Sequence, residues 1–391
     1  MELSHRITYL TGGGSDGWDV FYRARQMKAA GDPVLELTIG EHDIRTHPDI
    51  LGAMHRAAID GHTGYAMVPG TGALRASVAA RIAARTGVPT TAANIMITPG
   101  GQAALFASHH AVCDEGDTAL YIDPFYATYP GTIRGVGAVP VPVVTRAADH
   151  FQPQASAIDA VAKGAKSLLI NTPNNPTGVV YSHDTLTAIA DACQAHDLWL
   201  ISDEVYDTQV WDGTHISPRA LPDMGDRTLV VGSMSKSHAM TGSRVGWVCG
   251  PEHVIESLIN LATHTTYGVP GYIQDAATYA LGRGDPLEAE VAAPFARRRA
   301  LTIRALDGQN IVRAVPMQGA MYAMLDIRAT GMTGEAFSNA LLDAEMIATM
   351  PGESFGKAAA GHIRVAMTIN DDDYTDALTR LVTFAKTQVG S

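Results

Sequence analysis

The chain has 391 residues, of which 46% are hydrophobic and 17% charged, and its formal net charge is −12. This composition excludes a disordered or fibrous chain and leaves room for two domains. The acidic balance, without clustered Lys and Arg, argues against nonspecific binding to nucleic acid or to an anionic membrane. The scattered cysteines Cys113, Cys193 and Cys249 show neither metal nor disulfide spacing, so we expect a cytoplasmic protein. Without a signal-peptide pattern or a bilayer-length apolar stretch, we expect neither export nor membrane insertion.

The glycine-rich run at 12–17 formally fits both a dinucleotide-binding pattern and a nucleophile elbow. Both motifs require a βα core ahead of the glycines, and too few residues precede this run to form one. We therefore expect a flexible loop. Trp18, Phe21 and Tyr22 follow it and suggest an apolar or aromatic wall for a substrate.

A strand-like run at 94–98 leads through Gly100 and Gly101 into an Ala-rich helical pattern. Glycines allow close approach of a ligand to the backbone, and the N-terminus of a helix attracts phosphate. The pattern therefore predicts an anion site, although a glycine pair before a helix is common by itself.

Two further strand-like runs end in polar residues. The run at 167–170 leads into a proline-containing loop that could hold the amide of Asn175 rigidly, although a plain turn would look much the same. The run at 198–202 ends at Asp203. A carboxylate there can pair with a protonated ring nitrogen, or it can cap the following turn.

Lys236 follows the apolar run at 228–232 and is surrounded by small hydroxyl residues. A partly desolvated amine beside the fixed cation of Arg244 would be a good nucleophile toward a carbonyl; the alternative is a surface lysine in a Ser-rich loop. Arg364 lies inside the strand-like run at 362–367 and needs an anion. That anion could be a substrate carboxylate, but for the arginine taken alone we favour an internal Asp or Glu.

Together these segments resemble the fold-type I, pyridoxal-phosphate-dependent aminotransferases of class I/II over almost the whole chain. The matching elements are Asn-Pro-Thr-Gly at 175–178, Asp-Glu-Val-Tyr at 203–206, Ser-Met-Ser-Lys at 233–236 with Arg244, and Arg364. The resemblance implies an α/β fold with a mostly parallel sheet covered by helices on both faces, plus a smaller α+β domain. It places an N-terminal segment at 1–45, the large domain at 46–284 and the small domain at 285–391.

The resemblance also implies a role for each matching residue. Lys236 would form a Schiff base with pyridoxal 5′-phosphate, Asp203 would hold the ring nitrogen, and Asn175 and Tyr206 the phenolic oxygen. The other cofactor contacts implied are Gly101, Gln102, Ser233 and Arg244 at the phosphate, Tyr126 stacked on the ring, and Tyr65 at the phosphate of the neighbouring subunit. Arg364, Asn175 and Gly40 would bind the substrate α-carboxylate. The role of Tyr65 implies a homodimer with shared active sites.

The implied activity is ping-pong transfer of an amino group between an L-amino acid and a 2-oxo acid, with Lys236 and Asp203 in the chemistry and Tyr206 beside them. β-Eliminating C–S lyases and cyclopropane-forming synthases share this fold and cofactor. Aminotransferase-like domains also occur in DNA-binding regulators, but this chain has no basic helix-turn-helix extension.

Neither a metal site nor the preferred substrate is indicated by the sequence. The histidines at 42 and 47, or at 109 and 110, lack further ligands at metal spacing. A dicarboxylic substrate needs a second cation in the pocket. Arg45 is one candidate, although we favour a surface position for it.

Overall fold

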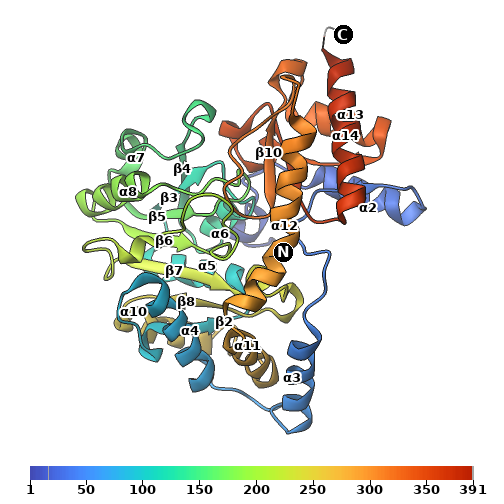
Figure 1. The fold of residues 1–391 in the computed structure, drawn as a ribbon. Coiled ribbons are helices and arrows are strands. Elements are labelled where there is room, and N and C mark those ends of the chain that lie inside the picture. The colour runs from blue at the N-terminus through green and yellow to red at the C-terminus, as the bar shows by residue number, and fades with distance from the viewer. Residues whose placement is uncertain (16, 390–391) are drawn as a thin grey trace.

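The computed structural model describes residues 1–15 and 17–389, and its largest element is a seven-stranded sheet (Figure 1). The strand order is β2-β8-β7-β6-β5-β3-β4, with only β8 antiparallel to its neighbours. The strands are β2 (Ile95–Thr98), β3 (Thr118–Asp123), β4 (Val139–Val144), β5 (Ala165–Asn171), β6 (Trp199–Asp203), β7 (Thr228–Ser233) and β8 (Gly246–Cys249). The predicted mostly parallel sheet is confirmed.

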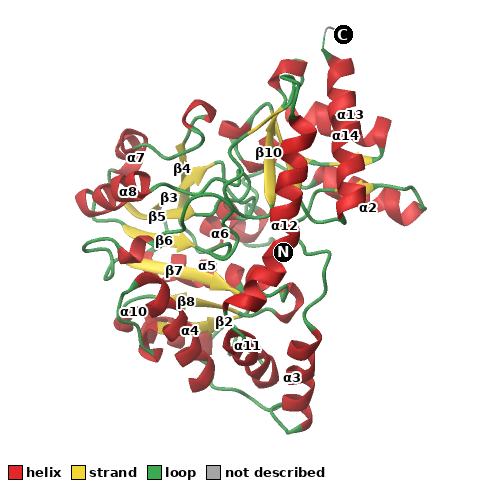
Figure 2. Cartoon of the chain, in the orientation of Figure 1, coloured by secondary structure: helices red, strands yellow, loops and turns green. Residues whose placement is uncertain are grey.

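Helices cover both faces of this sheet (Figure 2). One face carries α5 (Gly101–Val112), α6 (Tyr129–Gly135) and α10 (Glu252–Thr263); the other carries α4 (Gly72–Thr86), α7 (Ala155–Ala162), α8 (His183–Ala195) and α11 (Gly271–Gly282). Along β7, Leu229 and Val231 pack against the first group, whereas Val230 packs against α4 and α11. Because successive side chains of a strand point to opposite faces, a strand buried on both sides reads as a continuous apolar run.

A second, antiparallel sheet has the order β12-β13-β10-β9. Its strands are β9 (Arg313–Ala314), β10 (Tyr322–Asp326), β12 (Met350–Pro351) and β13 (His362–Ala366), and its core includes side chains of α12 (Asp285–Leu306), α13 (Gly334–Glu345) and α14 (Asp371–Gln388). The 22-residue α12 runs from the large sheet to this region (Figure 1). The connection is made by α12 although Pro294 lies inside it, whereas α10 ends at Thr263.

The N-terminal part of the chain contains α1 (His5–Thr8), α2 (Asp19–Ala30) and β1 (Leu35–Glu36), and β1 pairs in parallel with β11 (Ile347–Ala348). A helix, α1, and a turn precede the glycine-rich run, so the described residues supply no strand for a dinucleotide motif or a nucleophile elbow. Residue 16 of that run lies outside the described residues.

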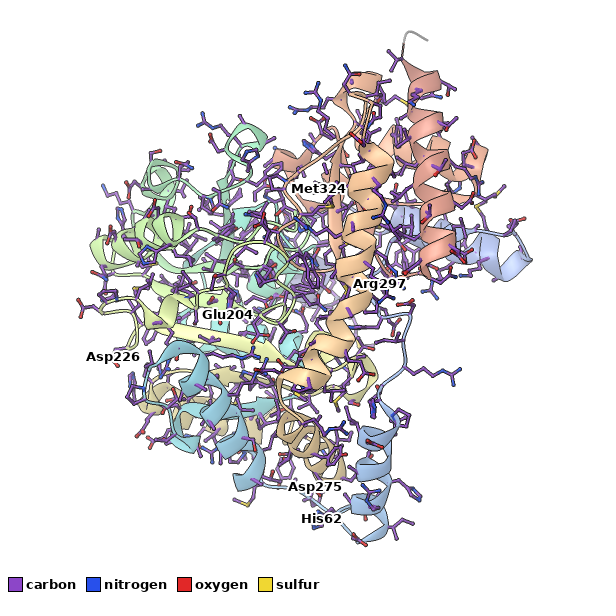
Figure 3. All side chains as sticks on the ribbon, in the orientation of Figure 1. His62, Glu204, Asp226, Asp275, Arg297 and Met324 are labelled. Carbon is purple, nitrogen blue, oxygen red and sulfur yellow. The ribbon has the colours of Figure 1, made fainter. Side chains whose placement is uncertain are left out.

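The remaining helices are α3 (Pro48–Ile59) and the single turn α9 (Met234–Ser237). His62, just after α3, forms an ion pair with Asp275 of α11 at the lower end of the molecule in Figure 3. Among the described residues, no helix combines the length and the apolar character needed to cross a bilayer. The domain boundaries at 45 and 284 stay predictions.

Candidate active site

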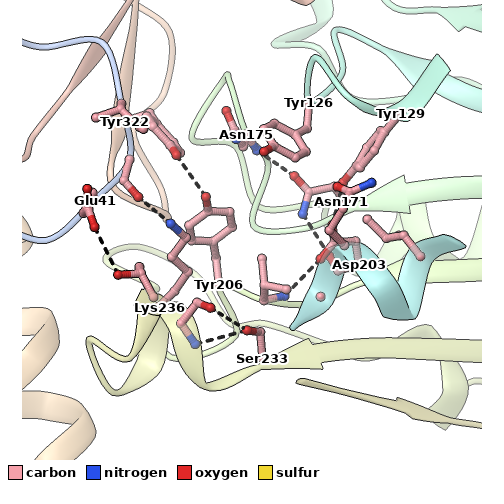
Figure 4. A pocket seen from close by; sticks show the side chains of 18 of the residues that line it. Glu41, Tyr126, Tyr129, Asn171, Asn175, Asp203, Tyr206, Ser233, Lys236 and Tyr322 are labelled. Carbon is pink, nitrogen blue, oxygen red and sulfur yellow. Dashed lines mark hydrogen bonds between the residues drawn. The ribbon is translucent and has the colours of Figure 1, made fainter. Parts of the chain in front are cut away.

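A cavity of about 300 Å³ lies where β5, β6 and β7 end, at the edge of the sheet where α/β proteins bind ligands (Figure 4). All the predicted site residues except Tyr65 line this cavity. Those that do are Gly40, Gly101, Gln102, Tyr126, Asn175, Asp203, Tyr206, Ser233, Lys236, Arg244 and Arg364. Parallel strands thus bring together side chains that are far apart in the sequence.

Lys236 lies on α9, the single helical turn that directly follows β7. Ser233 caps this turn, since its hydroxyl accepts a hydrogen bond from the Ser235 N–H at 3.1 Å. The Lys236 amine donates to the carbonyl of Gly40, which comes from the N-terminal segment (Figure 4). Burial and, to a smaller extent, the nearby cations Arg364 and Arg244 lower the pKa of Lys236. The amine is therefore a better nucleophile than that of a solvated lysine.

Asp203 ends β6 and is only 4% exposed. Its carboxylate accepts hydrogen bonds from the Tyr129 hydroxyl at 2.7 Å and from the Val205 N–H at 3.3 Å. Burial raises the pKa of Asp203 to about 6, although the bond from Tyr129 acts in the opposite direction. A buried carboxyl with neutral donors and no ion-pair partner among the described residues is suited to receive a cationic group.

The N-terminus of α5 faces the cavity through Gly101 and Gln102. Gly100 caps this helix with a φ of +82°, and a side chain there would collide with the Arg244 guanidinium. Arg244 itself has a φ of 51° and donates to the Thr241 carbonyl at 2.9 Å. Backbone N–H groups, a helix dipole and a guanidinium thus converge, which is the arrangement expected of a phosphate site.

Arg364 lies on β13 and is only 1% exposed. It donates to the Asn175 side-chain oxygen at 2.8 Å and to the Thr38 carbonyl. Its guanidinium carbon lies 4.4 Å from the centre of the Tyr322 ring and 4.3 Å from that of Phe355. The internal Asp or Glu that we favoured as its partner is absent among the described residues, and its Nε has no hydrogen-bond partner there. A buried arginine without an acid is suited to bind a carboxylate ligand.

Three tyrosines form the wall between these charged groups. The Tyr206 and Tyr322 hydroxyls are hydrogen-bonded at 3.0 Å, and burial raises the pKa of Tyr206 well above its usual value. Tyr126 packs edge-on against Tyr129, with ring centres 5.7 Å apart. Burial raises the pKa of Tyr126 as well, so the Tyr126 and Tyr206 hydroxyls can donate hydrogen bonds to an oxygen in the cavity.

Sequence reasoning missed three residues of this site. Tyr322 lines the cavity, and a side chain at Gly40 would collide with its hydroxyl. Tyr129 binds Asp203, and Asn171 binds both the Asn175 N–H at 2.7 Å and the Asp203 carbonyl at 2.9 Å. Asn171 and Tyr129 stood inside runs that follow predicted strands, which was a usable signal. The place of Tyr322 depends on the pairing of β10 with β13, which the sequence does not specify.

Several predicted positions lie away from the cavity. Tyr65 is 93% exposed and contacts Tyr267 edge-on, with ring centres 5.4 Å apart. Arg45 is exposed and does not line the cavity, as expected of a surface residue. Of the proposed aromatic wall, Trp18 lines the cavity, whereas Phe21 and Tyr22 do not.

Comparison with known proteins identifies the family. Residues 32–381 match the model of the aminotransferase class I and II family. The chain belongs to this family. It is 38% identical over its full length to the full-length arginine–pyruvate transaminase of Pseudomonas aeruginosa. It is 31% identical to an aspartate aminotransferase of Geobacillus stearothermophilus, over 98% of this chain and 99% of that one.

Solved structures agree with this assignment. A Thermus thermophilus aspartate aminotransferase mutant superimposes with a TM-score of 0.91 at 31% identity, over 99% of both chains. A Pyrococcus protein superimposes with a TM-score of 0.93 at 30% identity, also over 99% of both chains. The chain is therefore an aminotransferase with the fold-type I architecture, and the predicted family, fold class and enzyme class are confirmed.

Proposed function

We propose that this aminotransferase uses pyridoxal 5′-phosphate bound covalently through Lys236 to move an amino group from an L-amino acid to a 2-oxo acid by a ping-pong mechanism. The observation that carries the proposal is the presence, in one cavity, of a lysine with a lowered pKa, a buried carboxyl and a helix N-terminus with an arginine. The family supports the cofactor, since class I and II aminotransferases generally depend on it.

The residues of the cavity fit this cofactor in charge and in hydrogen-bonding capacity. The N-terminus of α5, Ser233 and Arg244 suit its phosphate. Asp203 suits a protonated ring nitrogen, because a cation there would stabilise the ionised form of a carboxyl that burial otherwise disfavours. Asn175 and Tyr206 supply donors for the ring oxygen, and Tyr126 supplies an aromatic face for stacking.

When bound, the cofactor supplies an electron sink for the carbanion that forms at the donor's α-carbon. Arg364 binds the α-carboxylate and fixes the donor's orientation. With the cofactor and donor held there, Lys236 Nζ would accept the donor's α-proton and later return a proton, as general base and then acid. Asp203 keeps the ring nitrogen protonated. Over the two half-reactions the donor would lose its amino group and gain an oxo oxygen from one water molecule, and the acceptor would gain the amino group and lose its oxo oxygen as one water molecule.

We further propose a homodimer in which Tyr65 contributes to the neighbouring cofactor site. The ring of Tyr65 is almost fully exposed and lies outside the cavity of its own chain, which supports a contact with another subunit. Two measurements on the wild type and Tyr65→Phe test this proposal: sedimentation for the oligomeric state and titration with pyridoxal phosphate for cofactor binding. We expect both proteins to be dimers and the variant to bind the cofactor more weakly; a monomeric wild type overturns the proposal.

Borohydride reduction followed by peptide mass analysis tests the covalent link. The reduced cofactor should be recovered on the peptide that contains Lys236, and Lys236→Ala should give no such adduct. A protein that binds no pyridoxal phosphate after reconstitution overturns the proposed function. Release of ammonia and pyruvate from cystathionine without an amino acceptor would instead indicate the C–S lyase activity that the same fold supports.

A further inference from the structure

We propose, resting on the function above, that the amino donor carries a cationic side chain and that the Glu41 carboxylate recognises it. The two substrate classes at issue are dicarboxylic donors, which need a free cation in the cavity, and cationic donors, which need a free acid. The charges that line the cavity decide between them.

Each cationic side chain of the cavity already has a role in binding or in the reaction. Among the described residues that line it, these are Lys236, Arg244 and Arg364. Lys236 is the reacting amine, Arg244 lies against the glycine loop before α5, and Arg364 is held by Asn175 where the α-carboxylate is to bind. None of the three is left to pair with a second carboxylate on the donor, so a dicarboxylic side chain would find no cationic partner among the described residues of this chain.

The side chain at the start of α5 is also unsuited to a second carboxylate. Gln102 is neutral, and both ends of its amide are engaged: its nitrogen donates to Thr132 at 2.7 Å and its oxygen accepts from Thr128 at 2.9 Å. A neutral amide held in this way offers no charge to a donor's side chain.

Among the described residues that line the cavity, two carry carboxylates, and they are placed differently. Asp203 is buried beneath the cavity against Tyr129. Glu41 directly follows Gly40 and is exposed, with Thr241 donating to its carboxylate at 3.2 Å (Figure 4). The negative charge of Glu41 acts to raise the pKa of Lys236, so Glu41 is close enough to interact electrostatically with the reacting amine. A bound donor would cover Glu41, and an ammonium or guanidinium group there would pair with it.

Trp18 adds a second feature that favours a cation. It lines the same cavity from the residue before α2, so the N-terminal segment contributes both an indole ring and a carboxylate. A large aromatic surface attracts a guanidinium more than a neutral group of the same shape, and it repels an acid. Arginine, which has a long apolar stem and a planar cation, fits these features best among the common amino acids.

Arginine and citrulline provide the matched test, because they differ only in a guanidinium against a neutral ureido group. Initial rates with holoenzyme and saturating pyruvate give kcat/KM for both donors. We expect the wild type to prefer arginine at least about tenfold, which corresponds to roughly 1.4 kcal/mol, and to use aspartate poorly. Glu41→Gln should abolish the preference. Glu335→Gln, an exposed acid on α13, is the control and should keep it.

The ratio of kcat/KM for arginine to kcat/KM for citrulline is taken on the same enzyme. A general effect of Glu41 on Lys236 changes both values equally and so cancels in the ratio. Equal use of arginine and citrulline by the wild type, an unchanged preference in Glu41→Gln, or a preference for aspartate each overturns the inference. With the cofactor recovered on Lys236, these outcomes leave the proposed function intact. A protein that takes up no cofactor overturns both.

Discussion

Asp203 ends β6 and Asp207 lies in the turn that follows, yet their environments have opposite effects on ionisation. Burial raises the pKa of Asp203 to about 6, and its hydrogen-bond donors are neutral. Burial would also raise the pKa of Asp207. The guanidinium groups of Arg81 at 3.0 Å and Arg85 at 2.6 Å have a larger effect and hold this pKa below the usual value. One carboxyl lacks a cation and the other has two.

The same contrast holds for the groups around each carboxyl. Arg81 and Arg85 both pair also with Glu288 of α12, so this cluster joins α4 to the long helix with its charges balanced. In the cavity, Lys236 and Arg364 form no ion pair among the described residues. Removing one partner of the paired cluster would leave a buried charge uncompensated and destabilise the fold, whereas buried charges that are already unpaired are suited to bind a ligand.

Replacing Lys236 with Ala should have the largest effect on activity and almost none on the fold. We expect kcat to fall by at least about 10⁴-fold, because both the covalent anchor and the proton carrier are lost. Thermal unfolding of the cofactor-free protein should be unchanged or shifted upward, since the variant no longer buries an amine. Initial rates and calorimetry check the two parts. Activity within tenfold of wild type would rule out the role of Lys236.

Asp203→Asn should lower kcat by roughly 10²- to 10⁴-fold, because a neutral amide cannot hold the ring nitrogen protonated. The amide oxygen can still accept the Tyr129 hydroxyl, so the fold is retained. Asp207→Asn is the matched control and should stay within a few-fold of wild-type kcat at temperatures where it is folded. A larger loss of kcat in the Asp207 variant than in the Asp203 variant would reverse the assignment of the two carboxyls.

The free energy of unfolding should rank the same two variants in the opposite order, with the larger loss in Asp207→Asn. Asp207→Asn leaves Arg81 with Glu288, and Arg85 with Glu288 and the exposed Asp285, and breaking a buried ion pair typically costs about 3–5 kcal/mol. We expect the free energy of unfolding, measured with urea, to fall by an amount near the lower end of this range, because Arg85 is partly exposed. An Asp207 variant as stable as wild type would show that the balanced cluster does not stabilise the fold.

Much of this site could be predicted because its residues follow strands with simple patterns. Lys236, Asp203 and Asn175 each stand just beyond an apolar run, and parallel strands place such positions at one edge of the sheet. The motifs supplied their roles through the family resemblance. The two-sided burial of β7 was likewise visible as an uninterrupted apolar stretch.

The rest depended on contacts that no local pattern records. Tyr322 reaches Arg364 because β10 pairs with β13, which sets Met324 opposite Arg364 and Tyr322 on the diagonal. The absence of an acid beside Arg364 was also hidden, since forty Asp and Glu residues were available as partners. The cluster around Asp207 went unnoticed because its members come from helices distant in sequence.

The pH dependence of stability provides the finest test of the contrast between the two carboxyls. In the cofactor-free protein, Asp203 has a folded pKa of about 6 against an ordinary value of 3.8, so the folded state binds more protons between these values. The wild type should therefore lose stability relative to Asp203→Asn as the pH rises from about 4 to 6, by ~3 kcal/mol at most, and the difference should be constant above. Asp207 has a lowered pKa, so its contribution is complete above 3.8 and is lost only as the pH falls below that value. Urea unfolding of wild type and both variants from pH 4 to pH 8 measures this. A difference between wild type and Asp203→Asn that does not change with pH would mean that Asp203 is as easily ionised as a solvated carboxyl, and the contrast with Asp207 would then disappear.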